Sequence, residues 1–171
     1  RSVKPTKRFW KSLFMRFGIG DAVFRYFDHA EVFQRISEKS ADDRVRYCIA
    51  SDENGKGRLL AVTSPKRPVI TYNEVNDLVQ RFDGRDVTYN DGIVTSTHTP
   101  RGGERPFEIR GDRFEHRFMM ETPVDGFSHT KIYLSFLRQV CSNGAIGYGR
   151  AFRSHVSLGK DIGHCIARAL D

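Results

Sequence analysis

Glycine-containing turns between stretches of alternating polarity most constrain how this chain can fold. Four such turns place a glycine directly after an asparagine, aspartate or arginine: Asn54-Gly55, Asp91-Gly92, Arg110-Gly111 and Asn143-Gly144. Polarity with a period of two is typical of a half-buried strand, and Asn-Gly and Asp-Gly favour the positive φ of a tight hairpin turn. The sequence therefore predicts four β-hairpins, over residues 44–64, 86–99, 107–122 and 131–152.

Other stretches carry apolar residues at the spacing of an amphipathic helix. We predict helices in four segments: residues 9–17, 21–39, 71–82 and 161–171. Asp28 with Glu31, and Thr71 with Glu74, form capping boxes, which mark where a helix begins. Because the helices bracket the hairpins, the predicted fold class is α+β, with mainly antiparallel β-hairpins packed with flanking helices in a single domain.

The length of 171 residues suits one domain, and thirteen phenylalanines favour a folded chain with a core. We divide it into a basic aromatic arm with a short helix, residues 1–19, and a single α+β domain, residues 20–171. No apolar run approaches the roughly 20 residues that span a membrane, and no signal peptide is recognisable. The sequence therefore predicts no membrane partner.

The cysteines and histidines exclude some kinds of site. Cys48, Cys141 and Cys165 are far apart and odd in number, which argues against a disulfide scaffold and for a reducing compartment. The chain has no C-x-x-C motif, and its six histidines show no H-x-x-x-H spacing, so no structural metal site is expected. We predict neither a metal nor a cofactor, and a cytoplasmic location.

Basic side chains are concentrated in two acid-free segments. The net charge is +7, and residues 1–20 hold six Lys or Arg while residues 126–160 hold five. A face that binds a polyanion needs such asymmetry, although a solvated basic surface has the same composition. The predicted nucleic-acid-binding residues are Arg138, Arg150, Arg153 and Lys160 in the second segment, and Lys7, Arg8, Trp10 and Lys11 in the first.

The aromatic stripe of the arm has two interpretations. Trp10, between Arg8 and Lys11, can stack on bases while the cations neutralise phosphates. The same stripe, which includes Phe9 and Leu13, can instead dock on the core of the domain or on a neighbouring subunit. Aromatic stripes at this spacing are more often part of a core, and both interpretations stay open at this point.

Cys141 is the candidate nucleophile of the chain. A cysteine nucleophile needs a base within hydrogen-bond reach and a group that orients the base. His129 and His155 lie on either side of the cysteine in the sequence, but no acid occurs between Asp125 and Asp161 to orient either of them. Catalysis through Cys141 is therefore the weaker interpretation.

A second hypothesis for this stretch is that the glycines after Cys141 form a phosphate-binding loop. A P-loop ends in Lys-Ser or Lys-Thr, and the stretch RQVCSNGAIGYGR has neither pair. Asn143-Gly144 needs only the positive φ of a tight turn, so a hairpin explains both residues. We therefore predict that Cys141 is a strand residue with a structural role.

Residues 118–158 also carry a recognisable series of residues, in this order: Arg138, Val140, Cys141, Asn143, Gly144, Arg153 and His155. This series resembles the DUF932 family of phage- and plasmid-like proteins. An earlier N-S-x-x-G-like element of that family is reduced here to Gly126 and the preceding Asp125. The resemblance implies work on DNA in the replication, recombination or packaging of a mobile element, in the host cytoplasm or in a virion.

We therefore predict a non-enzymatic nucleic-acid-binding protein of phage or plasmid origin that binds single- or double-stranded DNA and forms homo-oligomers. One alternative is a phage structural or assembly protein whose basic aromatic arm docks on a neighbouring subunit. A second alternative is a small enzyme that uses Cys141 with His155 or His129 as its base.

Overall fold

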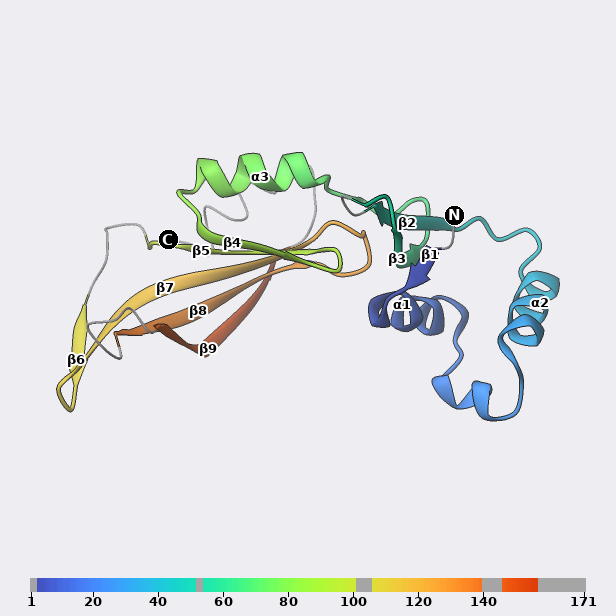
Figure 1. Cartoon of the computed structure of the whole chain (residues 1–171), viewed down its shortest axis with the longest axis horizontal. Helices are drawn as coiled ribbons and strands as arrows, with labels where there is room; N and C mark the ends of the chain where they lie inside the picture. Colours follow the sequence, from blue (N-terminus) through green and yellow to red (C-terminus); the bar gives the residue numbers. More distant parts are fainter. Residues whose placement is uncertain (1–2, 52–53, 101–105, 140–145, 157–171) are drawn as a thin grey trace. The chain divides into compact units, whose positions relative to one another are not determined.

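The computed structural model describes residues 3–51, 54–100, 106–139 and 146–156 (Figure 1). The chain divides into two compact units, and Asp125–Phe127 belong to unit 1 together with the residues up to Arg67. Unit 2 comprises Pro68–Val124 and the residues from Ser128 onward. The α+β class with mainly antiparallel sheets is confirmed. The division into an arm over residues 1–19 and one domain over residues 20–171 stays a prediction.

Unit 1 combines a three-stranded sheet with helices. Its elements are β1 (Val3–Pro5), α1 (Lys7–Phe17), the 3-10 helix η1 (Asp21–Arg25), α2 (His29–Lys39), β2 (Arg46–Ser51) and β3 (Gly57–Thr63). The strand order is β1-β3-β2, with β1 parallel and β2 antiparallel to β3. The predicted hairpin over residues 44–64 and the helical segment 21–39, broken once, are both confirmed.

Helix α1 is a core element of unit 1. The Thr6 side chain caps its first turn by accepting a hydrogen bond from the Phe9 N–H, and Gly18 ends it at φ 64°, a conformation that glycine adopts without strain. Phe9 and Leu13, four residues apart, are 3% and 2% exposed and pack with Val62 of β3. The apolar stripe of the arm therefore packs on the sheet of unit 1.

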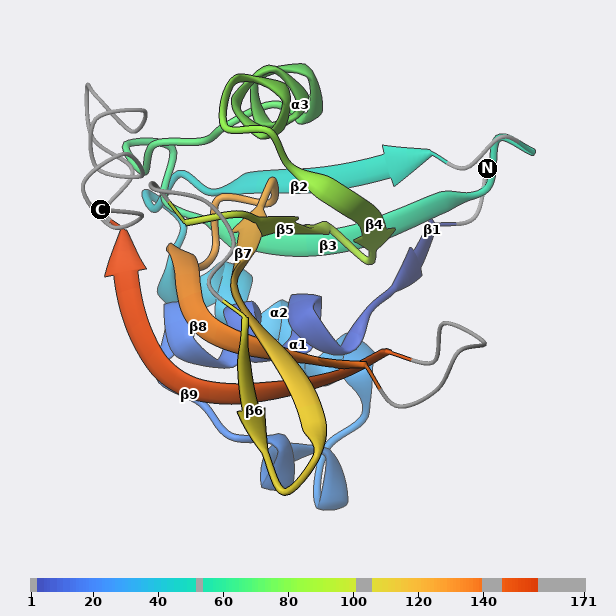
Figure 2. The same ribbon diagram turned by 90° about the vertical axis from the view of Figure 1, so that its left-hand side faces the viewer.

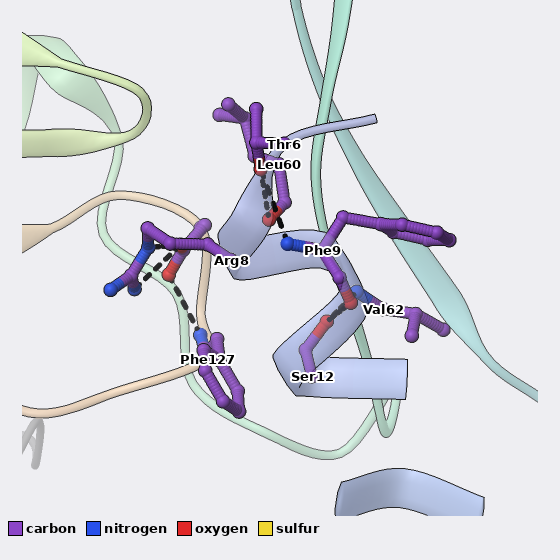
Figure 3. Close-up of polar contacts among 8 residues, drawn as sticks. Thr6, Arg8, Phe9, Ser12, Leu60, Val62 and Phe127 are labelled. Carbon is purple, nitrogen blue, oxygen red and sulfur yellow. Dashed lines mark hydrogen bonds and ion pairs between the residues drawn. The ribbon is translucent and has the colours of Figure 1, made fainter. Parts of the chain in front are cut away.

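Two sets of polar interactions hold α1 in place, one made by Ser12 and one by Arg8 (Figure 3). The Ser12 hydroxyl donates to the Phe9 carbonyl at 2.7 Å and accepts from the Val62 N–H at 2.9 Å. Arg8 donates from Nε and Nη2 to the Asp125 carboxylate, both at 2.7 Å, and the side chain of Asp125 is fully buried. The other carboxylate oxygen accepts the Phe127 N–H at 3.0 Å. This network joins residues 117 positions apart in the chain.

Unit 2 is a helix packed on a six-stranded sheet (Figures 1 and 2). Its elements are α3 (Tyr72–Arg81), β4 (Arg85–Asn90), β5 (Ile93–His98), β6 (Phe107–Ile109), β7 (Asp112–Pro123), β8 (Thr130–Gln139) and β9 (Ile146–Val156). The strand order is β4-β5-β7-β8-β9, and β6 pairs with β7. The core lies between α3 and the sheet, and it contains Val75 and Val79 of α3 together with Val94, Met120 and Ile132 of the strands.

The predicted turns of unit 2 are confirmed where the structure describes them. Asp91 and Gly92 have φ of 43° and 88°, and Arg110 and Gly111 have φ of 53° and 84°. Two successive positive φ values are what a type I′ turn requires, and they join β4 to β5 and β6 to β7. The turn at Asn143-Gly144 and the helix at 161–171 lie outside the described residues.

His98 is a buried titratable side chain of unit 2, with 1% of its surface exposed. Its Nδ1 lies 2.9 Å from the Phe82 carbonyl oxygen, which can only accept, so Nδ1 carries the proton. Nε2 then accepts from the Ser96 hydroxyl at 2.8 Å. Burial lowers the pKa of His98 below its ordinary value, against smaller opposing effects of the Phe82 hydrogen bond and the Asp83 charge.

This depressed pKa makes the stability of unit 2 depend on pH. The unfolded chain takes up a proton at His98 near pH 6.5, before the folded one does, so the neutral histidine stabilises the fold fully above that pH. Stability is expected to fall as the pH drops from about 6.5 toward the pKa of the folded state. Hydrogen exchange of the α3 amides between pH 8 and pH 5 measures this loss, and His98→Gln should remove the pH dependence while His116→Gln leaves it.

Candidate nucleic-acid interface

A shallow pocket in unit 1 brings together residues of α1, η1 and the start of α2. Its volume is about 600 Å³, and we name it the α1 pocket. Six of the side chains that line it are basic or aromatic: Lys7, Trp10, Lys11, Phe14, Phe24 and His29. Three of the four residues predicted for the first basic segment therefore lie in one pocket.

The aromatic rings of the α1 pocket form one connected cluster. The Trp10 ring lies 5.4 Å from Phe24 in an edge-to-face arrangement and 5.3 Å from His29. Phe24 and His29 stack at 4.4 Å with an interplanar angle of 23°. Trp10 is half-buried and His29 is exposed, so ring surface remains open to a ligand. Such surface is what base stacking uses.

The cations of the pocket come from one face of α1. Lys7 and Lys11 are exposed and lie four residues apart, so they stand one turn above the other beside Trp10. Asp21 also lines the pocket, which therefore contains one carboxylate beside the two ammonium groups. This acid reduces the positive potential at the η1 side of the pocket.

Arg8, the fourth residue predicted for this segment, does not line the α1 pocket. Its guanidinium group is engaged by the buried Asp125 carboxylate and lies 5.5 Å above the Phe127 ring. We assign Arg8 to the stability of unit 1. No residue near Arg8 in the sequence indicates this role, because the acid that binds Arg8 is 117 positions away in the chain.

The second basic segment lies on β8 and β9 of unit 2. Arg150 pairs with Ser135 and Arg153 with Tyr133, and the register shifts between Leu134 and Ser135. Tyr133 and Ser135 are two positions apart and share a face, so the bulge places Arg150 and Arg153 at register positions of that same face. Without the bulge, two residues that are three positions apart would fall on opposite faces of the sheet.

Arg138 falls at a register position of the other face. Arg138 pairs with Gly147 on β9 and with Phe114 on β7. It lies three positions from Ser135, and residues an odd number of positions apart on a regular strand fall on opposite faces of the sheet. The sheet therefore places two of the three arginines predicted in the second basic segment at register positions of one face. Lys160 lies outside the described residues.

The register also bears on the hypothesis of a cysteine enzyme. His155 pairs with Lys131, and the last described residue before Cys141, Gln139, is eight positions further along β8. Eight positions along a strand span about 26 Å. The exposed His129 precedes β8 at the His155 end. Cys141, Asn143 and Gly144 lie outside the described residues, and the enzyme hypothesis gains no support from this ladder.

The described part of the chain contains one half-buried cysteine, Cys48, and no cluster of metal-ligating side chains. No group of three or more His, Cys, Asp or Glu side chains there could hold a metal ion. Burial is the main cause that raises the pKa of the Cys48 thiol, and the charge of Asp125 adds to it. Cys48 is therefore a weak nucleophile at neutral pH. No helix among the described residues is long and apolar enough to cross a membrane.

Comparison with known proteins adds no relative. No family model, no curated protein and no solved structure matches the chain.

Proposed function

We propose that this protein binds single-stranded nucleic acid through the α1 pocket, without catalysis. One observation carries the proposal: Lys7, Trp10 and Lys11, named from the sequence alone, line one pocket with an aromatic cluster. The two ammonium groups would neutralise backbone phosphates, and the open ring surface would stack on unpaired bases. Bases in a duplex are already stacked, so the aromatic part of the pocket favours single strands.

Charge-neutral substitutions at the two lysines test the proposal. We expect Lys7→Gln with Lys11→Gln to weaken binding of a labelled oligothymidylate about tenfold at low salt, because each lysine releases a counterion when it meets a phosphate. The slope of log K against log salt should become less steep by about 1.4, the value for two phosphates on a single strand. Fluorescence anisotropy at several salt concentrations measures both quantities.

Two further variants serve as controls for this experiment. Asp21→Asn removes the acid of the pocket and should strengthen binding, which a loss of folding would not do. Lys39→Gln makes the same charge change as Lys11→Gln on α2, outside the pocket, and should leave the affinity nearly unchanged. If the wild-type protein binds neither DNA nor RNA at low salt, the proposal is wrong.

The DUF932 resemblance supports DNA of a mobile element as the partner, in replication or recombination. Arg150 and Arg153, at register positions of one face of unit 2, would add phosphate contacts of their own. Replacing both by Gln should lower the salt slope further in the same titration.

A role in subunit assembly is the second candidate function. Large apolar side chains of unit 1 are exposed, with Met15 at 69% and Tyr26 at 81%. A contact with a second subunit would bury such side chains and remove their apolar surface from water. Sedimentation of Met15→Ser with Tyr26→Ser tests this role without removing α1, whose Phe9 and Leu13 belong to the core.

A further inference from the structure

An apolar groove runs along α2 in unit 1. Its volume is about 340 Å³, and six apolar side chains line it: Phe17, Ile19, Val23, Phe27, Val32 and Ile36. They come from the end of α1 and the link that follows it, from η1 and its C-terminal flank, and from α2. The volume falls at the lower end of the range for small-molecule sites, about 300–1,000 Å³.

The walls of this groove leave apolar surface open to solvent. Phe27 is 51% exposed, and Val32 is the residue of α2 that is buried, at 5%. Helix α2 nevertheless begins with a complete capping box between Asp28 and Glu31. A well-formed amphipathic helix with so little of its apolar face buried is suited to cover an apolar ligand.

The charges beside the groove are unequal at its two ends. Glu31, Arg35 and Lys39 line it at successive turns of α2, so one acid lies toward the start of the helix and two cations toward its end. Arg35 also makes an exposed ion pair with Glu38, a kind of pair that contributes little. An anionic group would therefore bind at the Arg35 and Lys39 end.

We propose that the groove binds a monomeric amphipathic carboxylate, with the apolar tail along Val32 and Ile36 and the carboxylate near Arg35 and Lys39. The volume of about 340 Å³ is that of a small-molecule site, so the ligand is a single short chain. A ten-carbon carboxylate serves as the probe of this class. Among the described residues the groove and the α1 pocket have no lining side chain in common, so the inference does not depend on nucleic-acid binding.

Calorimetric titration with decanoate, below its micelle concentration, tests the inference. Decanoate should bind, while decyltrimethylammonium, which has a tail only one carbon longer and the opposite charge, should bind at least about tenfold more weakly. Acetate, which has the head group and no tail, should not bind measurably. No binding of decanoate, or equal binding of decanoate and decyltrimethylammonium, would overturn the inference.

Substitutions locate the binding in the groove. Arg35→Gln and Lys39→Gln should each weaken decanoate binding about three- to fivefold, and Phe27→Ala about tenfold. Lys66→Gln, at another exposed lysine of unit 1, and Tyr72→Ala, at a side chain of unit 2 that is also 51% exposed, should leave it unchanged. Trp10 emission checks that each variant of unit 1 folds, and far-UV circular dichroism checks Tyr72→Ala. Unchanged affinity in all three groove variants contradicts the assignment of the site.

Discussion

Asp125→Ala is expected to lower the free energy of unfolding of unit 1 by about 3 kcal/mol. The substitution removes the buried carboxylate that accepts two hydrogen bonds from Arg8 and one from the Phe127 N–H. Breaking a buried ion pair costs about 3–5 kcal/mol, and the lower end applies because the Arg8 side chain keeps 21% of its surface exposed. Urea unfolding followed by the emission of Trp10, the one tryptophan of the sequence, reports on this unit.

Asp43→Ala is the matched control for Asp125→Ala. Asp43 also pairs with an arginine of α1, Arg16, but its side chain is 36% exposed. An exposed pair contributes about 1 kcal/mol or less, so this variant should unfold close to the wild type. Equal destabilisation by the two substitutions would show that the burial of Asp125 is not what makes its ion pair with Arg8 important.

Phe9→Ala is expected to destabilise unit 1 by about 3–5 kcal/mol, the usual cost of truncating a buried phenylalanine. Phe9 is 3% exposed and packs with Leu13 and Val62, and its ring lies 5.2 Å from Trp10. The emission of Trp10 in the folded state changes with this substitution, so unfolding is followed by far-UV circular dichroism as well.

Two variants on the same helix calibrate this result. Met15→Ala, at a side chain that is 69% exposed, should change stability by about 0.5 kcal/mol or less. Phe9→Leu keeps most of the volume and should lie between the two, which gives a measurement even if Phe9→Ala does not fold. A small effect of both Phe9 substitutions would mean that α1 is a detachable arm.

The features of the fold that were predictable from the sequence are local ones. Thr71 and Glu74 are three residues apart, and their capping box starts α3 as predicted. Asp91 and Gly92 supply the positive φ values of the turn between β4 and β5. In such cases the residues that determine the structure are neighbours in the chain, so tertiary packing had little to override.

The features that escaped prediction depend on long-range pairing. The parallel pairing of β1 with β3 joins Val3 to Gly57. Because β1 is only three residues long, its sequence has no alternating pattern that would predict a strand. The ion pair between Arg8 and Asp125 spans most of the chain, so a residue predicted to bind phosphate proved to be engaged within the fold.

The candidate site was predictable only in part, for the same reason. Lys7, Trp10 and Lys11 share one helical face, which their spacing indicates. Phe24 and His29 complete the aromatic cluster from η1 and α2, and only the packing of these elements on α1 brings them there. On β9, the bulge opposite Leu134 and Ser135 of β8 changes which arginines share a face, and the alternation of polarity in the sequence does not reveal it.

Titration of the Trp10 emission with single-stranded DNA tests the central claim most directly. If bases stack on the α1 pocket, an oligothymidylate should quench the emission, and added salt should reverse the quenching. An abasic phosphodiester of equal length, which offers phosphates without bases, should bind more weakly and leave the emission nearly unchanged. Binding of the oligothymidylate with no change at Trp10, or no binding at low salt, would contradict the assignment of nucleic-acid binding to this pocket.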